Sequence, residues 1–167
     1  AEQERVAVLV ESWRRVIADL VAHGWELNIQ PSSGSIIHKA MVAILKAVNH
    51  RNVKMHFDAF HSIEWGENPA AMIRFARLWI VYLHLHGDKR RAPGADGDNQ
   101  DWDRIIAACR KIQSGVKKIP VLPEPFGKDT VKDEPNLGVG LPAMSPFPDY
   151  IERAYTRFQE AGLPVAA

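Results

Sequence analysis

The side chains best suited to chemistry in this chain are basic ones, gathered in a stretch that contains no acid. From Leu27 to Phe57 there is no aspartate or glutamate, and the basic side chains there are Lys39, Lys46, Arg51 and Lys54. A second basic group follows later and consists of Lys89, Arg90 and Arg91. Because basic surfaces bind backbone phosphates, these seven residues are our predicted nucleic-acid-binding site. The alternatives are an ordinary solvated surface or a contact with an acidic protein.

One pair within this stretch has the spacing of a ribonuclease motif. Arg51 and His56 are separated by four residues. The six residues resemble the short Arg–His motif of the HEPN ribonuclease family, in which the pair acts at a helical dimer interface. The resemblance extends no further along the chain. It implies that Arg51 holds phosphate and that His56 acts as a general acid or base.

Metal and cofactor sites find little support in the residue pattern. His84 and His86 would share a face on a strand and could then bind a metal together. On the helix that we expect there, the two side chains point about 200° apart. Cys109 is the single cysteine, and the chain has no His-Glu-x-x-His sequence. We therefore predict no metal, no cofactor and no catalytic residue other than the Arg51–His56 alternative.

The elements that must position these residues are predicted to be helices. Apolar residues recur at intervals of three and four along most of the chain, which is typical of amphipathic helices. The stretch Ile80–His86 also suits a strand, because Ile, Val and Tyr favour strands. We prefer a helix there, since the upstream helical pattern continues into it. The expected helices span residues 2–23, 36–48, 53–63, 69–86, 101–117 and 149–161.

A proline-rich segment divides the chain. Seven of the eleven prolines lie between Pro120 and Pro148, which excludes a helix there. The same segment carries too many apolar residues for a simple disordered linker. We expect a helical core over residues 1–118, an extended arm over 119–148, and a C-terminal helix and tail over 149–167. The predicted fold class is therefore all-α, a compact bundle of five or six helices with a long proline-rich arm.

Composition is that of an ordinary folded domain. The chain has 167 residues, a net charge of +1 and 25% charged residues, so charge alone names no partner. A single cysteine suits a reducing compartment and suggests a cytoplasmic protein. No apolar run approaches the ~20 residues of a membrane span, so we expect no membrane association.

The absence of a complete catalytic constellation favours a non-catalytic function. We predict a helical binding or assembly module that contacts nucleic-acid phosphates through its basic helix, as a subunit of a larger complex. Its protein partner, or a second copy of the chain, would be held by the proline-rich arm. The alternative is a small helical ribonuclease that uses Arg51 and His56.

Overall fold

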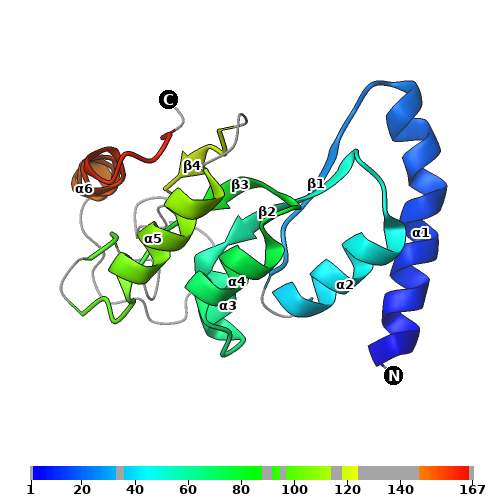
Figure 1. The fold of residues 1–167 in the computed structure, drawn as a ribbon, viewed down its shortest axis with the longest axis horizontal. Helices are drawn as coiled ribbons and strands as arrows, with labels where there is room; N and C mark the ends of the chain where they lie inside the picture. The colour runs from blue at the N-terminus through cyan, green and yellow to red at the C-terminus, as the bar shows by residue number, and fades with distance from the viewer. Residues whose placement is uncertain are drawn as a thin grey trace.

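Helices and short strands alternate along the chain (Figure 1). The computed structural model describes residues 2–32, 36–87, 92–94, 97–113, 118–123 and 147–165. The helices are α1 (Glu2–Ala22), α2 (His38–Val48), α3 (Ala59–Glu64), α4 (Pro69–Ala76), α5 (Trp102–Ile112) and α6 (Phe147–Glu160). The strands are β1 (Leu27–Ile29), β2 (Val53–Asp58), β3 (Ile80–His84) and β4 (Val121–Leu122).

The four strands form one sheet in the order β1-β2-β3-β4, and every pairing is parallel. Parallel neighbours require a crossover, and α2, α4 and α5 lie in the crossovers between successive strands. After α6 the chain returns to the β4 edge, where Val165 pairs parallel with Val121. The Val121 amide donates to the Pro164 carbonyl at 2.8 Å. The architecture is therefore a run of β–α units that continues beyond β4.

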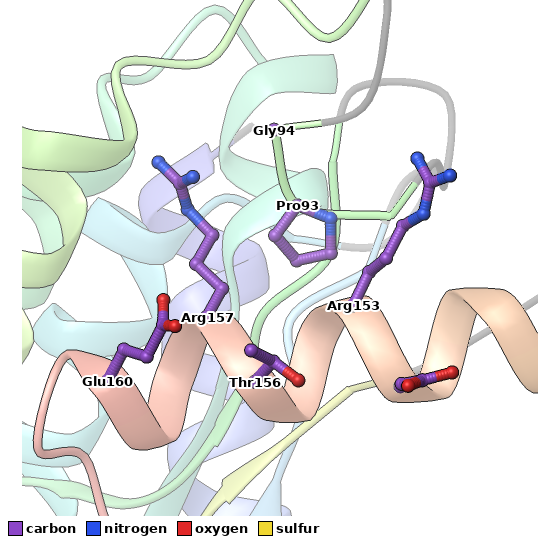
Figure 2. Close-up of a pocket in the computed structure, with 7 residues that line it drawn as sticks. Pro93, Gly94, Arg153, Thr156, Arg157 and Glu160 are labelled. Carbon is purple, nitrogen blue, oxygen red and sulfur yellow. The ribbon is translucent and has the colours of Figure 1, made fainter.

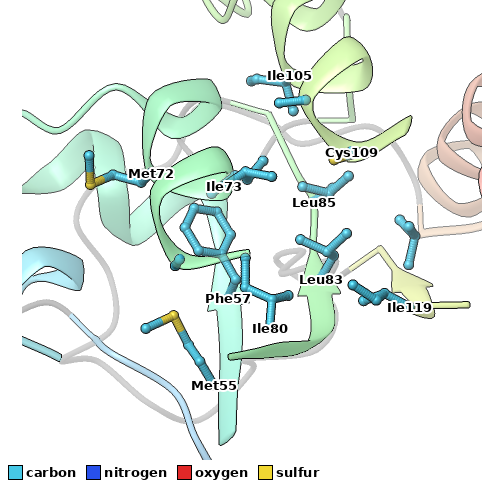
Figure 3. Packing of buried hydrophobic residues seen from close by; sticks show 14 of the residues in the cluster. Met55, Phe57, Met72, Ile73, Ile80, Leu83, Leu85, Ile105, Cys109 and Ile119 are labelled. Atoms are coloured by element: carbon cyan, nitrogen blue, oxygen red, sulfur yellow. The ribbon is translucent and has the colours of Figure 1, made fainter. Parts of the chain in front are cut away.

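The core lies between the sheet and the helices that cover one of its faces. Met55 and Phe57 of β2 and Leu83 of β3 are completely buried. They pack with apolar residues of the covering helices, among them Ile73 of α4 and Ile105 of α5 (Figure 3). Figure 1 shows α1 beyond the β1 side of the sheet and α6 beyond the β4 side.

The other face of the sheet is polar. Lys54 and His56 alternate with the buried residues of β2 and are only partly buried. Tyr82 and His84 of β3 lie beside them, with the His56 and His84 ring centroids 3.9 Å apart. Successive residues of a strand point to opposite faces, so one face of this sheet is apolar and the other carries hydrogen-bonding groups.

The predicted all-α bundle is wrong. Residues 53–58 form strand β2, where a helix was expected, and the helix expected over 69–86 ends at Ala76 before strand β3. Short apolar runs suit a buried parallel strand as well as a helix. Here these runs form strands because they pair with neighbouring strands of the sheet. The expected arm begins differently too, because Val121 and Leu122 pair with β3 in the sheet. Residues 124–146 of that arm lie outside the described part of the chain.

Other expected elements are confirmed with small changes at their ends. The first, fifth and last predicted helices correspond to α1, α5 and α6. Gly24 follows α1 with a positive φ of 68°, a conformation that suits glycine after a helix. Within the described residues, no helix is long and apolar enough to cross a membrane.

Candidate active site

A buried carboxylate lies at the carboxyl end of the central strand β2. Asp58 is fully buried, and its Oδ1 lies 3.1 Å from Nε2 of His86, just beyond β3. Its Oδ2 accepts a hydrogen bond from Nε2 of Gln30, just beyond β1, at 3.1 Å. Ligands of parallel α/β sheets bind at the carboxyl ends of the strands. Asp58, at the end of β2, therefore meets Gln30 and His86, which lie just beyond the two neighbouring strands. They meet at the edge of the sheet where ligands are expected to bind.

Asp58 also begins helix α3. Its Oδ1 accepts a hydrogen bond from the Phe60 amide at 2.8 Å, as an N-cap residue does. Burial by itself raises the pKa of the Asp58 carboxyl, but the hydrogen bond and charge of His86, the charge of His61 and the Phe60 amide outweigh it. The net effect is a pKa well below the ordinary value, so the carboxylate stays charged although it is buried.

His61 joins this carboxylate to a more exposed one. Its Nε2 lies 3.5 Å from Oδ2 of Asp58, and its Nδ1 lies 2.9 Å from Oε2 of Glu64. The Glu64 side chain is 34% exposed, whereas Asp58 is sealed from solvent. An imidazole between two carboxylates can hand a proton from one to the other. We call Gln30, Asp58, His61, Glu64 and His86 the Asp58 cluster.

A third buried histidine, His38, lies near the cluster. Nδ1 of His38 is 3.0 Å from Oε2 of Glu67 and 3.3 Å from the Ser62 hydroxyl. Burial lowers the pKa of His38, and its contact with Glu67 only partly opposes that effect. Ser62 and Glu67 approach the same ring nitrogen, so these three residues lack the relay geometry of a serine nucleophile. The group is better suited to supporting the site than to attacking a substrate.

The four predicted basic residues that the structure describes lie on three different parts of the fold. Lys39 and Lys46 lie on α2, and the Lys46 ammonium sits over the Phe75 ring at 5.5 Å. Arg51 precedes β2, at the opposite end of the strand from Asp58, whereas Lys54 lies within β2. Lys89, Arg90 and Arg91 lie outside the described residues.

Arg51 and His56 do not form a helical pair either. Arg51 is exposed in the turn before β2, and His56 lies on that strand against the rings of Tyr82 and His84. The helical setting that the resemblance implied is absent because β2 is paired on both sides. His84 is the last residue of strand β3 and His86 lies just beyond it, so the helix that argued against a shared site is wrong. Even so, the described residues contain no group of three His, Cys, Asp or Glu side chains that could hold a metal ion.

Asp58, His61 and Gln30 were missed as site residues. Gln30 and Asp58 are 28 positions apart in the sequence, and only sheet pairing brings them together. A usable signal was present: Asp58 ends a stretch in which Val53, Met55 and Phe57 alternate with polar residues. Interpreted as a strand, that pattern would have placed Asp58 at a carboxyl end.

The sequence matches the family described as the xylose isomerase-like TIM barrel over residues 1–146. The chain belongs to this family. No curated protein sequence matches it. The parallel sheet with helical crossovers agrees with the family, and both the helical binding module and the helical ribonuclease are wrong.

Solved structures of sugar epimerases have the same fold. A D-allulose 3-epimerase from Methylomonas sp. is 19% identical with a TM-score of 0.77, covering 95% of this chain and 56% of that one. A D-psicose 3-epimerase from Clostridium cellulolyticum H10 is 21% identical, with a TM-score of 0.70 and coverage of 97% and 57%. An L-ribulose 3-epimerase is 19% identical, with a TM-score of 0.75 and coverage of 91% and 52%.

This xylose isomerase-like chain therefore spans somewhat more than half the length of those structures. Active sites of TIM barrels lie at the carboxyl ends of the strands, where the Asp58 cluster lies. The Asp58 cluster therefore lies where this fold is expected to hold its active site. The reaction has to be argued from the residues themselves.

Proposed function

We propose that this chain carries part of the active site of an enzyme that epimerises or isomerises a small ketose sugar. The observation that carries the proposal is the buried, charged Asp58 carboxylate, joined to His86 and His61 at the carboxyl edge of a xylose isomerase-like sheet. The epimerase names of the structures with the same fold support the choice of substrate.

Such a reaction moves a proton at the carbon beside the carbonyl group. A base removes that proton, its electron pair enters the carbon–oxygen system, and a proton is then returned to complete the product. Glu64 and His61 form a path along which a proton could pass between the site and solvent. Asp58 holds the inner end of this path and orients both histidines.

The donor types at the site suit a divalent cation. Asp58 offers carboxylate oxygen and His86 offers imidazole nitrogen, donor types that occur in divalent-cation sites, although the described residues hold no group of three such side chains that could bind an ion by themselves. The described residues supply only part of a coordination shell, so further ligands would have to come from elsewhere. A bound cation would polarise the sugar carbonyl.

Proton exchange into substrate tests this proposal. The purified chain is incubated with D-fructose, D-allulose or L-ribulose in D₂O with Mn²⁺, and NMR follows loss of the proton beside the carbonyl. Asp58→Asn should slow exchange by about 10²–10⁴-fold, because it keeps the cap but removes the charge. Asp103→Asn, an exposed change on α5, should leave the rate unchanged.

Metal binding gives a second readout that does not need turnover. Titration with Mn²⁺ should show a site in the parent chain and in Asp103→Asn, but weaker binding in Asp58→Asn. Absence of both exchange and Mn²⁺ binding from the parent chain would refute the proposal. We further propose a cytoplasmic location, supported by the single, buried and free Cys109.

A further inference from the structure

A pocket of about 610 Å³ lies away from the Asp58 cluster, between α6 and residues 93–94. Arg153, Thr156 and Arg157 of α6 line it, with Gly94 across from them. Figure 2 shows both arginine side chains rising from the same side of α6 and flanking Pro93. Nothing in the proposed ketose chemistry uses these residues.

Arg157 is held in the pocket without a partner for its charge. Its Nε is buried and makes no hydrogen bond, and its guanidinium lies over the Trp102 ring at 5.9 Å. Among the described residues, no carboxylate forms an ion pair with Arg157 or Arg153. A buried guanidinium N–H without an acceptor is costly, because it has given up water and gained nothing in return. The Arg157 side chain as a whole is only half-buried, so its outer guanidinium N–H groups are the ones that an oxyanion in the pocket could reach.

The opposite wall is built to let the guanidinium approach. The Arg157 guanidinium packs closely on Gly94, since a Cβ added there would lie 2.9 Å from Nη1 of Arg157, and the φ of +75° at Gly94 also favours glycine. The Gly94 amide donates to Oδ2 of Asp98 at 2.7 Å, and the same oxygen accepts from the indole of Trp102. Asp98 therefore holds Gly94 in position relative to Trp102, the residue whose ring lies under the Arg157 guanidinium.

We propose that this pocket binds the phosphate group of a small polyhydroxylated molecule, such as a sugar phosphate. Arg153 and Arg157 offer guanidinium groups and Thr156 offers a hydroxyl, and these donor types bind phosphate oxygens. Glu152 and Glu160 also line the pocket, and their carboxylates can accept hydrogen bonds from sugar hydroxyls. The inference does not depend on the chemistry assigned to Asp58.

Calorimetric titration of the purified chain tests the proposal and separates the two sources of phosphate. The probes are fructose 6-phosphate, inorganic phosphate and unphosphorylated fructose. We expect heat from both phosphate probes, tighter binding of the sugar phosphate, and no Arg157-dependent heat from fructose. Binding should weaken as sodium chloride is raised, because chloride screens the arginines.

Two substitutions at one position separate charge from packing. Arg157→Met keeps an unbranched apolar side chain against Trp102 but removes the charge, and should weaken phosphate binding at least about tenfold. Arg157→Lys keeps the charge and should retain part of the affinity. Arg74→Gln, on the exposed side of α4, is the matched control and should bind like the parent. Thermal unfolding verifies that each variant is folded.

The following results would contradict the proposal that the pocket binds a sugar phosphate. No heat from either phosphate probe at millimolar concentration, or equal binding by the parent and a folded Arg157→Met, would overturn the site. Binding of inorganic phosphate alone would overturn the sugar-phosphate assignment. Sugar-phosphate binding that is lost in Asp58→Asn but kept in Arg157→Met would place the ligand at the Asp58 cluster instead.

Discussion

At the scale of single residues, burial and hydrogen bonding divide the histidines into different roles. His38 is completely buried and lies against the Phe57 ring, with its Nε2 unbonded among the described residues. His86 is equally buried but lies against the charged Asp58. Around His38, burial disfavours a positive charge more strongly than the nearby Glu67 carboxylate favours it.

Burial lowers the pKa of His38 below its ordinary value of 6.5, which predicts a pH-dependent stability. Below about pH 6.5 the unfolded chain takes up a proton that the folded chain does not. The free energy of unfolding should therefore fall as pH drops from about 7 toward the lower, folded-state pKa. Urea unfolding across this range should show a smaller slope for His38→Gln than for the parent.

The exposed His23 provides the control for this effect. His23→Gln should keep the slope of the parent chain. If His38→Gln keeps the parental slope as well, His38 does not supply the pH dependence.

The Cys109 thiol should react only slowly with thiol reagents in the folded chain. Burial raises the pKa of its thiol to about 12, so almost none of the reactive thiolate is present at pH 8. Labelling with a thiol reagent at pH 8 should be slow in buffer and rapid in urea. Rapid labelling of the native chain would contradict the buried position of this side chain.

The residues that could be predicted from sequence are those defined by their neighbours along the chain. Gly24 after α1 and the N-cap Asn68 before α4 are signals of this local kind, and the structure shows both at helix ends. Asp58 and His86 form a candidate site only through their contact across the sheet, and the sequence around either residue does not show that contact. The candidate site was missed for this reason, although His86 was considered as a metal ligand.

At the scale of elements, helix α2 is capped by a residue from another part of the chain. Its N-cap is Ile37, which makes no side-chain hydrogen bond. The Glu67 carboxylate instead accepts the amides of His38 and Lys39, at 3.1 and 3.2 Å, as well as the His38 ring. A negative charge at a helix N-terminus is also favoured by the helix dipole.

Glu67→Gln should destabilise the chain by about 1–3 kcal/mol, because it weakens charge-assisted bonds at a nearly buried position. Glu11→Gln, which removes an exposed pair with Arg15, should cost about 0.5 kcal/mol or less. Chemical denaturation measures both values. Equal effects would show that Glu67 contributes no more than a surface charge.

Strands were the elements that sequence periodicity misjudged. In β3, Ile80, Val81 and Leu83 are all buried, so the simple alternation of a half-exposed strand is lost. Their spacing also continues the pattern of α4, which favoured one long helix. Helices with a clear polar side, such as α1 and α5, were predicted well because their periodicity is independent of pairing.

At the scale of the whole molecule, the parallel sheet should be the most stable part. β2 and β3 have a strand on both sides and carry completely buried residues. Hydrogen exchange should therefore be slowest at amides such as Phe57 and Leu83 and faster along α1, which has many exposed positions. Faster exchange in β2 than in α1 would contradict this order.

The pairing of Val121 with Val165, which follows α6, has a consequence for synthesis on the ribosome. Chains fold from the amino terminus as they emerge, and β1, β2 and β3 can associate early. The Val121 amide must wait for the Pro164 carbonyl, which follows α6. Until then, β4 presents an open edge to other nascent strands, and emergence of residues 164–165 from the ribosome is the event that closes it.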